Sequence, residues 1–478
     1  MKIRIVFPAL FVVFLLFTVG CNNDVFKPDN DLDDSGRINK FIVSCVKNLY
    51  LWESETDWSM YDNYNTLSLY DNHYNLFNEL VYKEDRWSVL TDNINGLKAI
   101  ISGITITYGY KISIIRNTKD NSLYALVLFT YPDTPASIAG IKRGDIIMGI
   151  DGEKITESNY RKLNNSSSIS IDMGYYDGEK IQKKHGETVL LTAVETYENP
   201  ILKYMVIETG AHKIGYLCYA DYVIKSEADL IKVFSEFKDR GITDFVLDLR
   251  YNSGGTSQTA KMLSSILAPA FTVRNKDVYM MKKWNNLFMS IQDENELNEY
   301  FDNTLPVNMD LKKLYVLTSD ISSSASEANI IGLKSCMEVI LIGDTTRGKY
   351  FGGYLLSPED YYGIIPEKGI KRDYYKNYNN WGLYLMIYRF SNKNGFPQSV
   401  NGLVPDILAF EDELYLVPFG DKSDPLLGRA LELITGEAYM KAFSAPVNRS
   451  LYSVERDKKV GRALEGKFIY TGDLPVKN

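Results

Sequence analysis

The sequence predicts a multidomain α/β protein. Helical periodicity dominates residues 37–102, a β-rich block follows over 103–195, and strands alternate with helices across 196–440. A chain of 478 residues is long enough for two or three domains. Strands that alternate with helices favour a mixed sheet covered by helices on both faces. We therefore expect an α/β core with an inserted β-rich domain and a small helical N-terminal domain.

Residues 1–21 have the layout of an export signal. Lys2 and Arg4 make a short basic start, residues 5–20 carry no charge, and Cys21 follows at once. The uncharged stretch is short for a membrane span of about 20 residues. A cysteine at this position resembles a bacterial lipoprotein signal peptide, which implies lipidation of Cys21 and a membrane-anchored protein on the periplasmic or outer-surface side of the cell envelope. An uncleaved N-terminal anchor is the alternative.

Composition disfavours several other classes of protein. The formal net charge of −8 argues against nucleic acid as a partner, because phosphate binding depends on clustered Lys and Arg. The three remaining cysteines are far apart, which favours buried thiols over a disulfide framework: Cys45, Cys218 and Cys336. The three histidines show no metal-ligand spacing: His73, His185 and His212. We expect no metal and no other cofactor.

A polar, acidic stretch over residues 22–36 is typical of a flexible linker. Apolar residues then recur at three- and four-residue steps, and a second stretch of this kind covers 74–82. The first set consists of Phe41, Ile42, Cys45, Leu49 and Trp52. Residues 37–102 are therefore predicted to form the small helical domain.

The β-rich block opens with an alternating, β-branched stretch over 104–115 and a second strand pattern over 124–130. A short helix signal at 136–139 and a strand at 146–150 follow, with glycine-containing turns between them. We expect one β domain over 103–195. Ordinary hairpins of some other β fold would also account for these turns.

Four motifs in this block resemble, in their order, the PDZ domains of bacterial proteases: Pro135-Ala136, Ala139-Gly140, Gly144-Asp145-Ile146-Ile147 and Ile150-Asp151-Gly152. The resemblance implies that the domain binds the C-terminus of a peptide, which joins the sheet as a strand while backbone amides hold its carboxylate. We expect the loop at Gly109 and Tyr110 to hold that carboxylate.

The α/β pattern of the core places three loops at strand ends. Predicted strands cover 214–218, 245–250, 314–318 and 339–342, and predicted helices cover 227–240, 259–267 and 326–333. In a doubly wound arrangement, such strand ends gather on one edge of the sheet, where sites form. We expect the loops after 250, 318 and 342 to converge. Residues 441–478 are polar and are predicted to be a peripheral tail.

Ser324 lies on the second of these loops, just before a predicted helix, and Lys349 lies on the third. A serine hydroxyl becomes a nucleophile only when a base takes its proton, and lysine can do this without histidine. Helix N-termini offer unpaired N–H groups that suit a developing oxyanion. Gly254 and Gly255, on the first loop, allow backbone N–H groups to approach a ligand. Helix capping by residues 322–326 is the alternative.

The ordered set of motifs resembles the C-terminal processing, or tail-specific, serine peptidases. The matching elements are the PDZ-like block, Asp248-Leu249-Arg250 with Asn252 and Gly254-Gly255, Ser324-Ala325-Ser326-Glu327, Gly343 through Thr346 to Gly348-Lys349, and Gly402-Leu403-Val404-Pro405-Asp406 with Asp424-Pro425-Leu426-Leu427. The resemblance implies a core with the mixed sheet of ClpP- and crotonase-like folds. It also implies Ser324 as nucleophile, Lys349 as general base, and an oxyanion hole from Ala325 with Gly254 or Gly255.

One position departs from this family pattern. Family members often place a glutamine four residues after the lysine, where it orients the base, and here that position is Gly353. Tyr350, Ser326 or Glu327 could supply a substitute hydrogen bond. The implied substrates are exported proteins or peptides with exposed C-termini.

A lysine that acts as a base near pH 7 must be neutral. Its ordinary pKa of about 10.4 must fall by roughly 3 units, which costs about 4 to 5 kcal/mol. Burial away from carboxylates lowers a lysine pKa in this way. We therefore expect Lys349 in a largely apolar pocket beside Ser324.

Other functions stay open at this point. Because Gly353 replaces the glutamine, the chain could be a catalytically inactive, peptide-binding lipoprotein of the same fold. Residues 343–349 also spell most of a phosphate-binding loop, but Tyr350 stands where magnesium binding needs Ser or Thr, so we expect no nucleotide. The 35 tyrosines and 5 tryptophans could mark a glycan-binding protein. His212 could join Ser324 in a triad, although no acid motif accompanies it.

Overall fold

The computed structural model describes residues 32–61, 67–291, 293, 297–367, 369–395, 401–412, 414–439, 452–455, 468–471 and 474. The predicted signal peptide, its Cys21 and most of the predicted linker lie outside these residues. Within the described ranges, none of the helices combines the length and the apolar character that a bilayer crossing requires.

The N-terminal part is helical and packs on the core. It contains α1 (Asp34–Leu49), α3 (His73–Leu80) and α4 (Ile94–Ser102), with short 3₁₀ turns η1 (Glu53–Glu55) and η2 (Trp58–Met60). Helix α1 begins inside the predicted linker, because Asp33 caps it by accepting a hydrogen bond from the Gly36 N–H. Strand β1 (Val89–Thr91) then pairs with β19 (Gly382–Ser391) of the core. This part therefore extends a core sheet.

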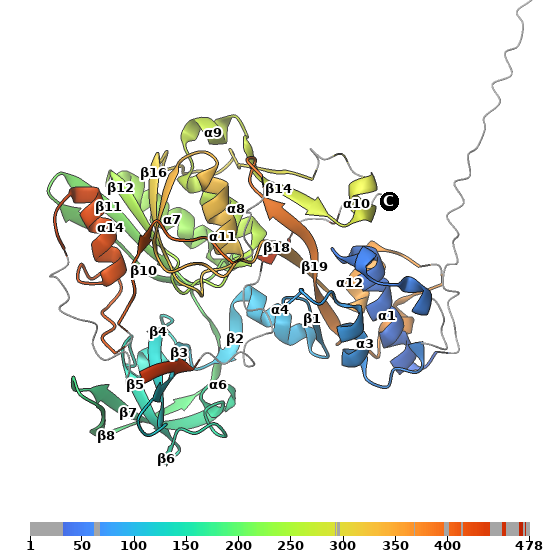
Figure 1. The fold of residues 1–478 in the computed structure, drawn as a ribbon, viewed down its shortest axis with the longest axis horizontal. Helices are drawn as coiled ribbons and strands as arrows, with labels where there is room; N and C mark the ends of the chain where they lie inside the picture. The colour runs from blue at the N-terminus through green and yellow to red at the C-terminus, as the bar shows by residue number, and fades with distance from the viewer. Residues whose placement is uncertain are drawn as a thin grey trace, which may run out of the picture.

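The β-rich part has its own sheet and its own hydrophobic cluster. The strand order is β21-β3-β4-β5-β7-β8, with β6 on β5, and β2 pairs separately with β9. The elements are β2 (Ile104–Thr107), β3 (Tyr110–Asn117), β4 (Leu123–Thr130), α5 (Pro135–Ile138), β5 (Ile146–Ile150), β6 (Glu153–Lys154), α6 (Lys162–Asn165), β7 (Ser168–Tyr176), β8 (Ile181–Thr192), β9 (Val194–Tyr197) and, from the tail, β21 (Tyr452–Glu455). Figure 1 shows this part below the core.

The main core sheet is mixed and has the order β10-β11-β12-β16-β17-β20. Its strands are β10 (Ile201–Thr209), β11 (His212–Tyr219), β12 (Asp244–Asp248), β16 (Lys313–Thr318), β17 (Glu338–Gly343) and β20 (Ile407–Leu408). All neighbours are parallel except β10 and β11. The predicted mixed α/β core is confirmed.

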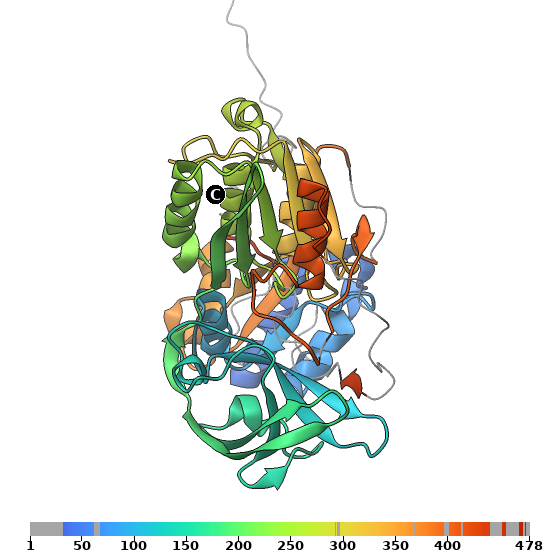
Figure 2. The same cartoon turned by 90° about the vertical axis from the view of Figure 1, so that its left-hand side faces the viewer.

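Alternate residues of these strands pack on opposite faces of the sheet. On one face they meet helices α7 (Glu227–Asp239), α8 (Ser257–Leu267) and α11 (Ala325–Lys334), and on the other face they meet α14 (Pro425–Thr435). Figure 2 shows α14, in red, on the opposite side of the sheet from the green helices. The sheet is therefore covered on both faces, as predicted.

A second core sheet has the order β13-β22-β18-β19-β14-β15. It contains β13 (Gly255–Thr256), β14 (Val278–Trp284), β15 (Glu299–Tyr300), β18 (Phe351–Leu356), β19 and β22 (Phe468–Ile469). The remaining turns and helices are η3 (Ile224–Ser226), α9 (Ala270–Arg274), α10 (Asn286–Ile291), α12 (Pro358–Ile364) and α13 (Arg372–Tyr375). This sheet carries the residues that follow two of the three predicted loops.

The expectation of a peripheral tail is wrong for its described residues. Strand β22 lies between β13 and β18, and Ile469 and Leu474 are buried. Strand β21 pairs with β3 of the β-rich part. Polar composition did not predict this, because short strands are held largely by main-chain hydrogen bonds and need few apolar side chains.

Candidate active site

Ser324 lies between β16 and α11 and is fully buried. Its backbone has φ 61° and ψ −107°, a conformation that costs a non-glycine residue about 1 to 3 kcal/mol. Within the described part of the chain, its Oγ has no hydrogen-bond partner. Ser324 and Glu327 have the arrangement of a capping box at the start of α11, but the Ser324 side chain makes no capping hydrogen bond, so its hydroxyl is available for chemistry.

The serines around Ser324 explain how this conformation is held. Ser322 Oγ donates to the Leu249 carbonyl at 2.8 Å, and Ser323 Oγ donates to the Ser253 carbonyl at 2.9 Å. Ser326 Oγ donates to the Asn252 carbonyl at 3.0 Å. Three of the serines thus bind the neighbouring 249–253 loop and leave Ser324 as the one with an unused hydroxyl.

The same loop continues into the two glycines. Both have positive φ, 117° at Gly254 and 144° at Gly255, and a Cβ at Gly255 would lie 2.1 Å from the Tyr222 carbonyl oxygen. The Gly254 N–H donates to Asn252 Oδ1 at 2.9 Å. Gly254 is therefore already engaged as a donor here, whereas Ala325, at the first position of α11, has no acceptor within its own helix.

Lys349 is fully buried on the loop between β17 and β18. Its Nζ donates to the Tyr384 Oη at 3.2 Å and lies 5.2 Å from the centre of the Trp87 ring. Burial lowers the pKa of Lys349 to about 7, against smaller opposing effects from Asp85 and Glu327. Trp87 precedes β1, so the N-terminal part supplies one wall of this largely aromatic environment.

Glu327 ties the loops of Ser324 and Lys349 together. Its Oε2 accepts the Ser324 N–H and the Lys349 N–H, each at 2.8 Å, so the two backbone nitrogens are at most 5.6 Å apart. Its Oε1 accepts the Gly348 N–H at 2.7 Å and the Thr346 hydroxyl at 2.6 Å. Burial raises the pKa of Glu327, and these hydrogen bonds lower it in part. The loops of Ser324 and Lys349 therefore converge.

None of the three residues considered for orienting the base reaches the Lys349 amine. Glu327 contacts the Lys349 backbone, Ser326 contacts Asn252, and the Tyr350 hydroxyl has no partner among the described residues. The partner is Tyr384 on β19. No signal in the sequence distinguished it from the other tyrosines.

Gly353 makes the space that Tyr384 fills. A Cβ at Gly353 would lie 2.5 Å from ring carbons of Tyr384 and 2.5 Å from Met386 Cε. Any side chain on this strand position would therefore collide with the aromatic ring. The absence of a glutamine at position 353 and the presence of Tyr384 beside Lys349 therefore depend on each other.

The structure excludes two of the alternatives, a phosphate-binding loop at residues 343–349 and a triad that contains His212. The Thr346 hydroxyl and the Gly348 N–H are bound by the Glu327 carboxylate, so residues 343–349 do not present a phosphate cradle. His212 begins β11 and pairs with Asp244 at 2.8 Å. Since β11, β12 and β16 are parallel, His212 lies at the opposite sheet edge from Ser324, which follows the end of β16.

The predicted peptide loop lies in the β-rich part, apart from these residues. Gly109 has φ 83°, and a Cβ there would lie 2.1 Å from Thr134 Cβ. Its N–H donates to Thr107 Oγ1 at 2.9 Å. Tyr110 begins β3 and donates its buried hydroxyl to the Leu163 carbonyl at 2.6 Å.

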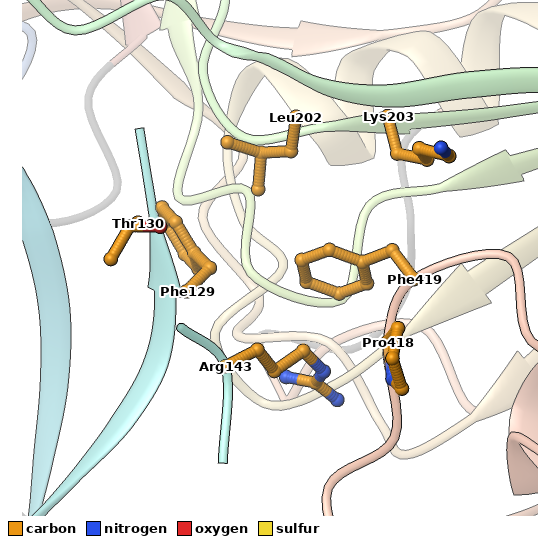
Figure 3. Close-up of a pocket in the computed structure, with 7 residues that line it drawn as sticks. All are labelled: Phe129, Thr130, Arg143, Leu202, Lys203, Pro418 and Phe419. Carbon is orange, nitrogen blue, oxygen red and sulfur yellow. The ribbon is translucent and has the colours of Figure 1, made fainter. Parts of the chain in front are cut away.

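Figure 3 shows a pocket between the β-rich part and the core, lined by Phe129, Thr130, Arg143, Leu202, Lys203, Pro418 and Phe419. The Arg143 guanidinium lies over the Phe419 ring at 4.4 Å and forms an ion pair with Glu411. Neither Ser324 nor Lys349 lines this pocket. No group of metal-ligating side chains occurs among the described residues.

Comparison with known proteins places the core in a family. Residues 213–409 match Peptidase family S41. The carboxyl-terminal-processing protease of a Picosynechococcus strain is 21% identical over 319 residues, which cover 65% of this chain and 66% of that protein. The carboxy-terminal processing protease CtpB of Bacillus subtilis is 23% identical over 295 residues, covering 57% and 56%. The chain thus spans less than two thirds of these relatives' lengths.

A solved structure shares the fold. The putative S41 protease from Bacteroides fragilis has a TM-score of 0.66 and 22% identity, over 83% of this chain and 97% of that one. The resemblance to C-terminal processing peptidases, and the α/β fold that it implied, are confirmed. The part of the chain at residues 213–409 thus matches peptidase family S41.

Proposed function

We propose that the protein is a serine endopeptidase in which Ser324 is the nucleophile and Lys349 is the general base. One observation carries this proposal: a buried serine hydroxyl without a partner and a buried lysine with a pKa of about 7 lie on loops joined by one carboxylate oxygen. The match to peptidase family S41 supports the same activity.

In the first step, Ser324 Oγ attacks the carbonyl carbon of the scissile peptide bond, and its proton passes to the neutral Lys349 Nζ. The oxyanion accepts hydrogen bonds from the Ala325 N–H and a glycine N–H. We assign Gly255 to the second role, because Gly254 already donates to Asn252. The Lys349 ammonium then protonates the leaving amine, and water hydrolyses the acyl-enzyme by the reverse proton transfers.

Tyr384 and Glu327 act as positioning residues in this scheme. When Lys349 is neutral, a hydrogen bond from Nζ to Tyr384 Oη fixes the amine and leaves its lone pair free to face Ser324. Glu327 accepts main-chain N–H groups from both loops, so it sets the spacing of the pair through the backbone. Its charge favours the protonated amine, but burial of Lys349 outweighs this effect.

The substrates that we propose are exported proteins or peptides with exposed C-termini. The PDZ-like motifs of the β-rich part, and relatives whose names refer to carboxyl-terminal processing, support this substrate class. The signal-like residues before Cys21 support a lipid-anchored protein of the cell envelope. The PDZ role of residues 103–195, with Gly109 and Tyr110 at the carboxylate, belongs to this proposal.

A second candidate function is peptide binding without cleavage. Ser324 and Lys349 are both fully buried, so a substrate reaches them only when the covering residues move. A protein locked in this covered state would capture peptides and release them intact.

The deciding experiment incubates the purified protein with an unfolded protein substrate that ends in apolar residues. Ser324→Ala and Lys349→Ala variants are assayed beside it, and Ser335→Ala serves as a control that removes a serine hydroxyl at the opposite end of α11. We expect cleavage by the parent and the control only. Equal cleavage by all four proteins would refute the dyad, and binding without cleavage by any of them would favour the second candidate.

A further inference from the structure

The C-terminal tail returns to the molecule at two places after α14 ends. Strand β21 adds to β3 of the β-rich part, and β22 fits between β13 and β18 of the core. Figure 1 shows the red strand of the tail beside β3. Both contacts are strand additions, and the first is made on β3, the strand that follows the proposed carboxylate loop at Gly109 and Tyr110.

Strand β21 covers an edge that is otherwise open in the described sheet. Strand β3 has β4 on one side and β21 on the other, with Tyr452 opposite Asn117 and Glu455 opposite Ile114. An unpaired edge strand presents free N–H and C=O groups to any extended peptide. The tail therefore satisfies the main-chain groups that would bind an incoming strand.

The direction of β21 also matches that of a bound C-terminal peptide. It runs antiparallel to β3, so each further residue comes closer to Tyr110 and Gly109, the proposed carboxylate loop. The tail does not end there, because it continues to β22 at Phe468. It therefore offers strand pairing without a terminal carboxylate, and a true C-terminus could make one additional contact.

The far end of the tail is firmly anchored. Gly255 pairs with Phe468, the Tyr470 N–H donates to the Gly353 carbonyl at 2.9 Å, and the Tyr470 ring lies 5.2 Å from that of Trp284. Because α14 precedes the tail and β22 follows β21, residues 452–455 remain tethered on both sides whether they are paired or not. Such tethering gives a segment a high effective concentration and allows weak pairing to persist.

We propose that residues 452–455 are a built-in competitor for the β3 edge, so that a substrate C-terminus is captured only by displacing the chain's own tail. This inference rests on the proposed peptide-binding role of the β-rich part. The tail then selects among ligands. Peptides that pair along β3 and also reach the carboxylate loop displace β21, whereas extended segments from the interior of a protein do not.

The test measures binding of a fluorescent peptide with an apolar C-terminus to the full chain carrying Ser324→Ala, which prevents cleavage. Ser453→Pro/Val454→Pro removes two successive N–H groups from β21, and one of any two successive residues in an antiparallel strand donates to its partner. The matched control, Arg449→Pro/Ser450→Pro, places the same two prolines just before the strand. Hydrogen exchange at the β3 amides reports whether the edge has been released.

We expect the strand variant to expose the β3 amides and to bind the peptide at least about fivefold more tightly, because the competing state no longer reduces the available fraction. The control should match the parent in both measurements. An amidated peptide should bind less tightly to every variant, since it lacks the carboxylate.

Three results would overturn the inference. Equal peptide affinity in parent and strand variant, with the β3 edge released, would refute competition by the tail but would leave the peptide-binding role of the β-rich part intact. If no peptide binds even when the edge is released, both the competition and the peptide-binding role are refuted. Unchanged hydrogen exchange in the strand variant shows that residues 452–455 do not protect β3 in solution.

Discussion

Tyr384→Phe is the sharpest test of how the base is held. The substitution removes one oxygen, the acceptor 3.2 Å from Lys349 Nζ, and keeps the ring that fills the space at Gly353. The packing of β18 against β19 should therefore survive. What changes is the single polar contact of the Lys349 amine among the described residues.

The expected effects follow from that contact. A hydrogen bond of this kind contributes about 0.5 to 1.5 kcal/mol, so losing it should lower kcat/KM at its high-pH plateau about two- to twelve-fold. The Tyr384 oxygen also stabilises the ammonium more than the amine, so its removal lowers the Lys349 pKa further. If Lys349 is the base, activity of the parent should rise with pH through about 7, and this limb should move to lower pH in the variant.

The assay is the pH dependence of kcat and KM on one peptide substrate. Tyr388→Phe is the matched control, because it removes a hydroxyl from the same strand, on a ring 4.9 Å from Trp284. We expect the control to keep the parent's plateau and pH limb. A Tyr384→Phe enzyme with an unchanged plateau and an unchanged limb would refute the positioning role, even if its stability had fallen.

Three further perturbations test the same site. Lys349→Met should raise the free energy of unfolding below pH 7 by about 4 kcal/mol, because the Lys349 pKa of about 7 in the folded state lies below its unfolded value of about 10.4. The parent gains stability as pH rises between these two values, so urea titrations at pH 6 and pH 10 should show that the variant's advantage shrinks. An advantage that does not change with pH would contradict this prediction. Gly353→Gln should lower Tm and activity by collision with Tyr384, and Gly353→Gln/Tyr384→Ala should recover part of the Tm loss; no recovery would mean that the ring is not the obstacle. Glu327→Gln leaves one acceptor oxygen for four donors, so the free energy of unfolding should fall by about 2 to 4 kcal/mol and kcat should fall with it. A variant with full kcat would show that the Glu327 carboxylate does not set the spacing between Ser324 and Lys349.

The fold and the meeting of two loops could be predicted because they depend on patterns within short segments. Apolar runs that end in Gly or polar residues marked the strand ends before Ser324 and Lys349, and parallel strands gather such ends on one edge. The spacing of helical apolar residues likewise predicted α1. These signals are local, so one sequence is enough to detect them.

Contacts across distant segments could not be predicted in this way. Trp87 reaches Lys349 because β1 pairs with β19, and Tyr384 does so because β19 pairs with β18. No local sequence pattern predicts either strand pairing, and the chain has too many tyrosines for Tyr384 to be singled out as the Lys349 partner. The sequence alone indicates a missing side chain at Gly353, whereas the structure shows that this glycine leaves the space from which Tyr384 reaches Lys349.

The aromatic wall around Lys349 has a consequence for the life of the chain before it folds. Trp87, Lys349 and Tyr384 lie far apart in sequence, and contacts of such separation form late in folding. Until then the lysine keeps its ordinary pKa of about 10.4 and stays protonated, so it cannot activate a serine. On the proposed mechanism, proteolytic capacity therefore arises only with the finished fold, and a nascent or misfolded copy carries Ser324 and Lys349 without the ability to damage its neighbours.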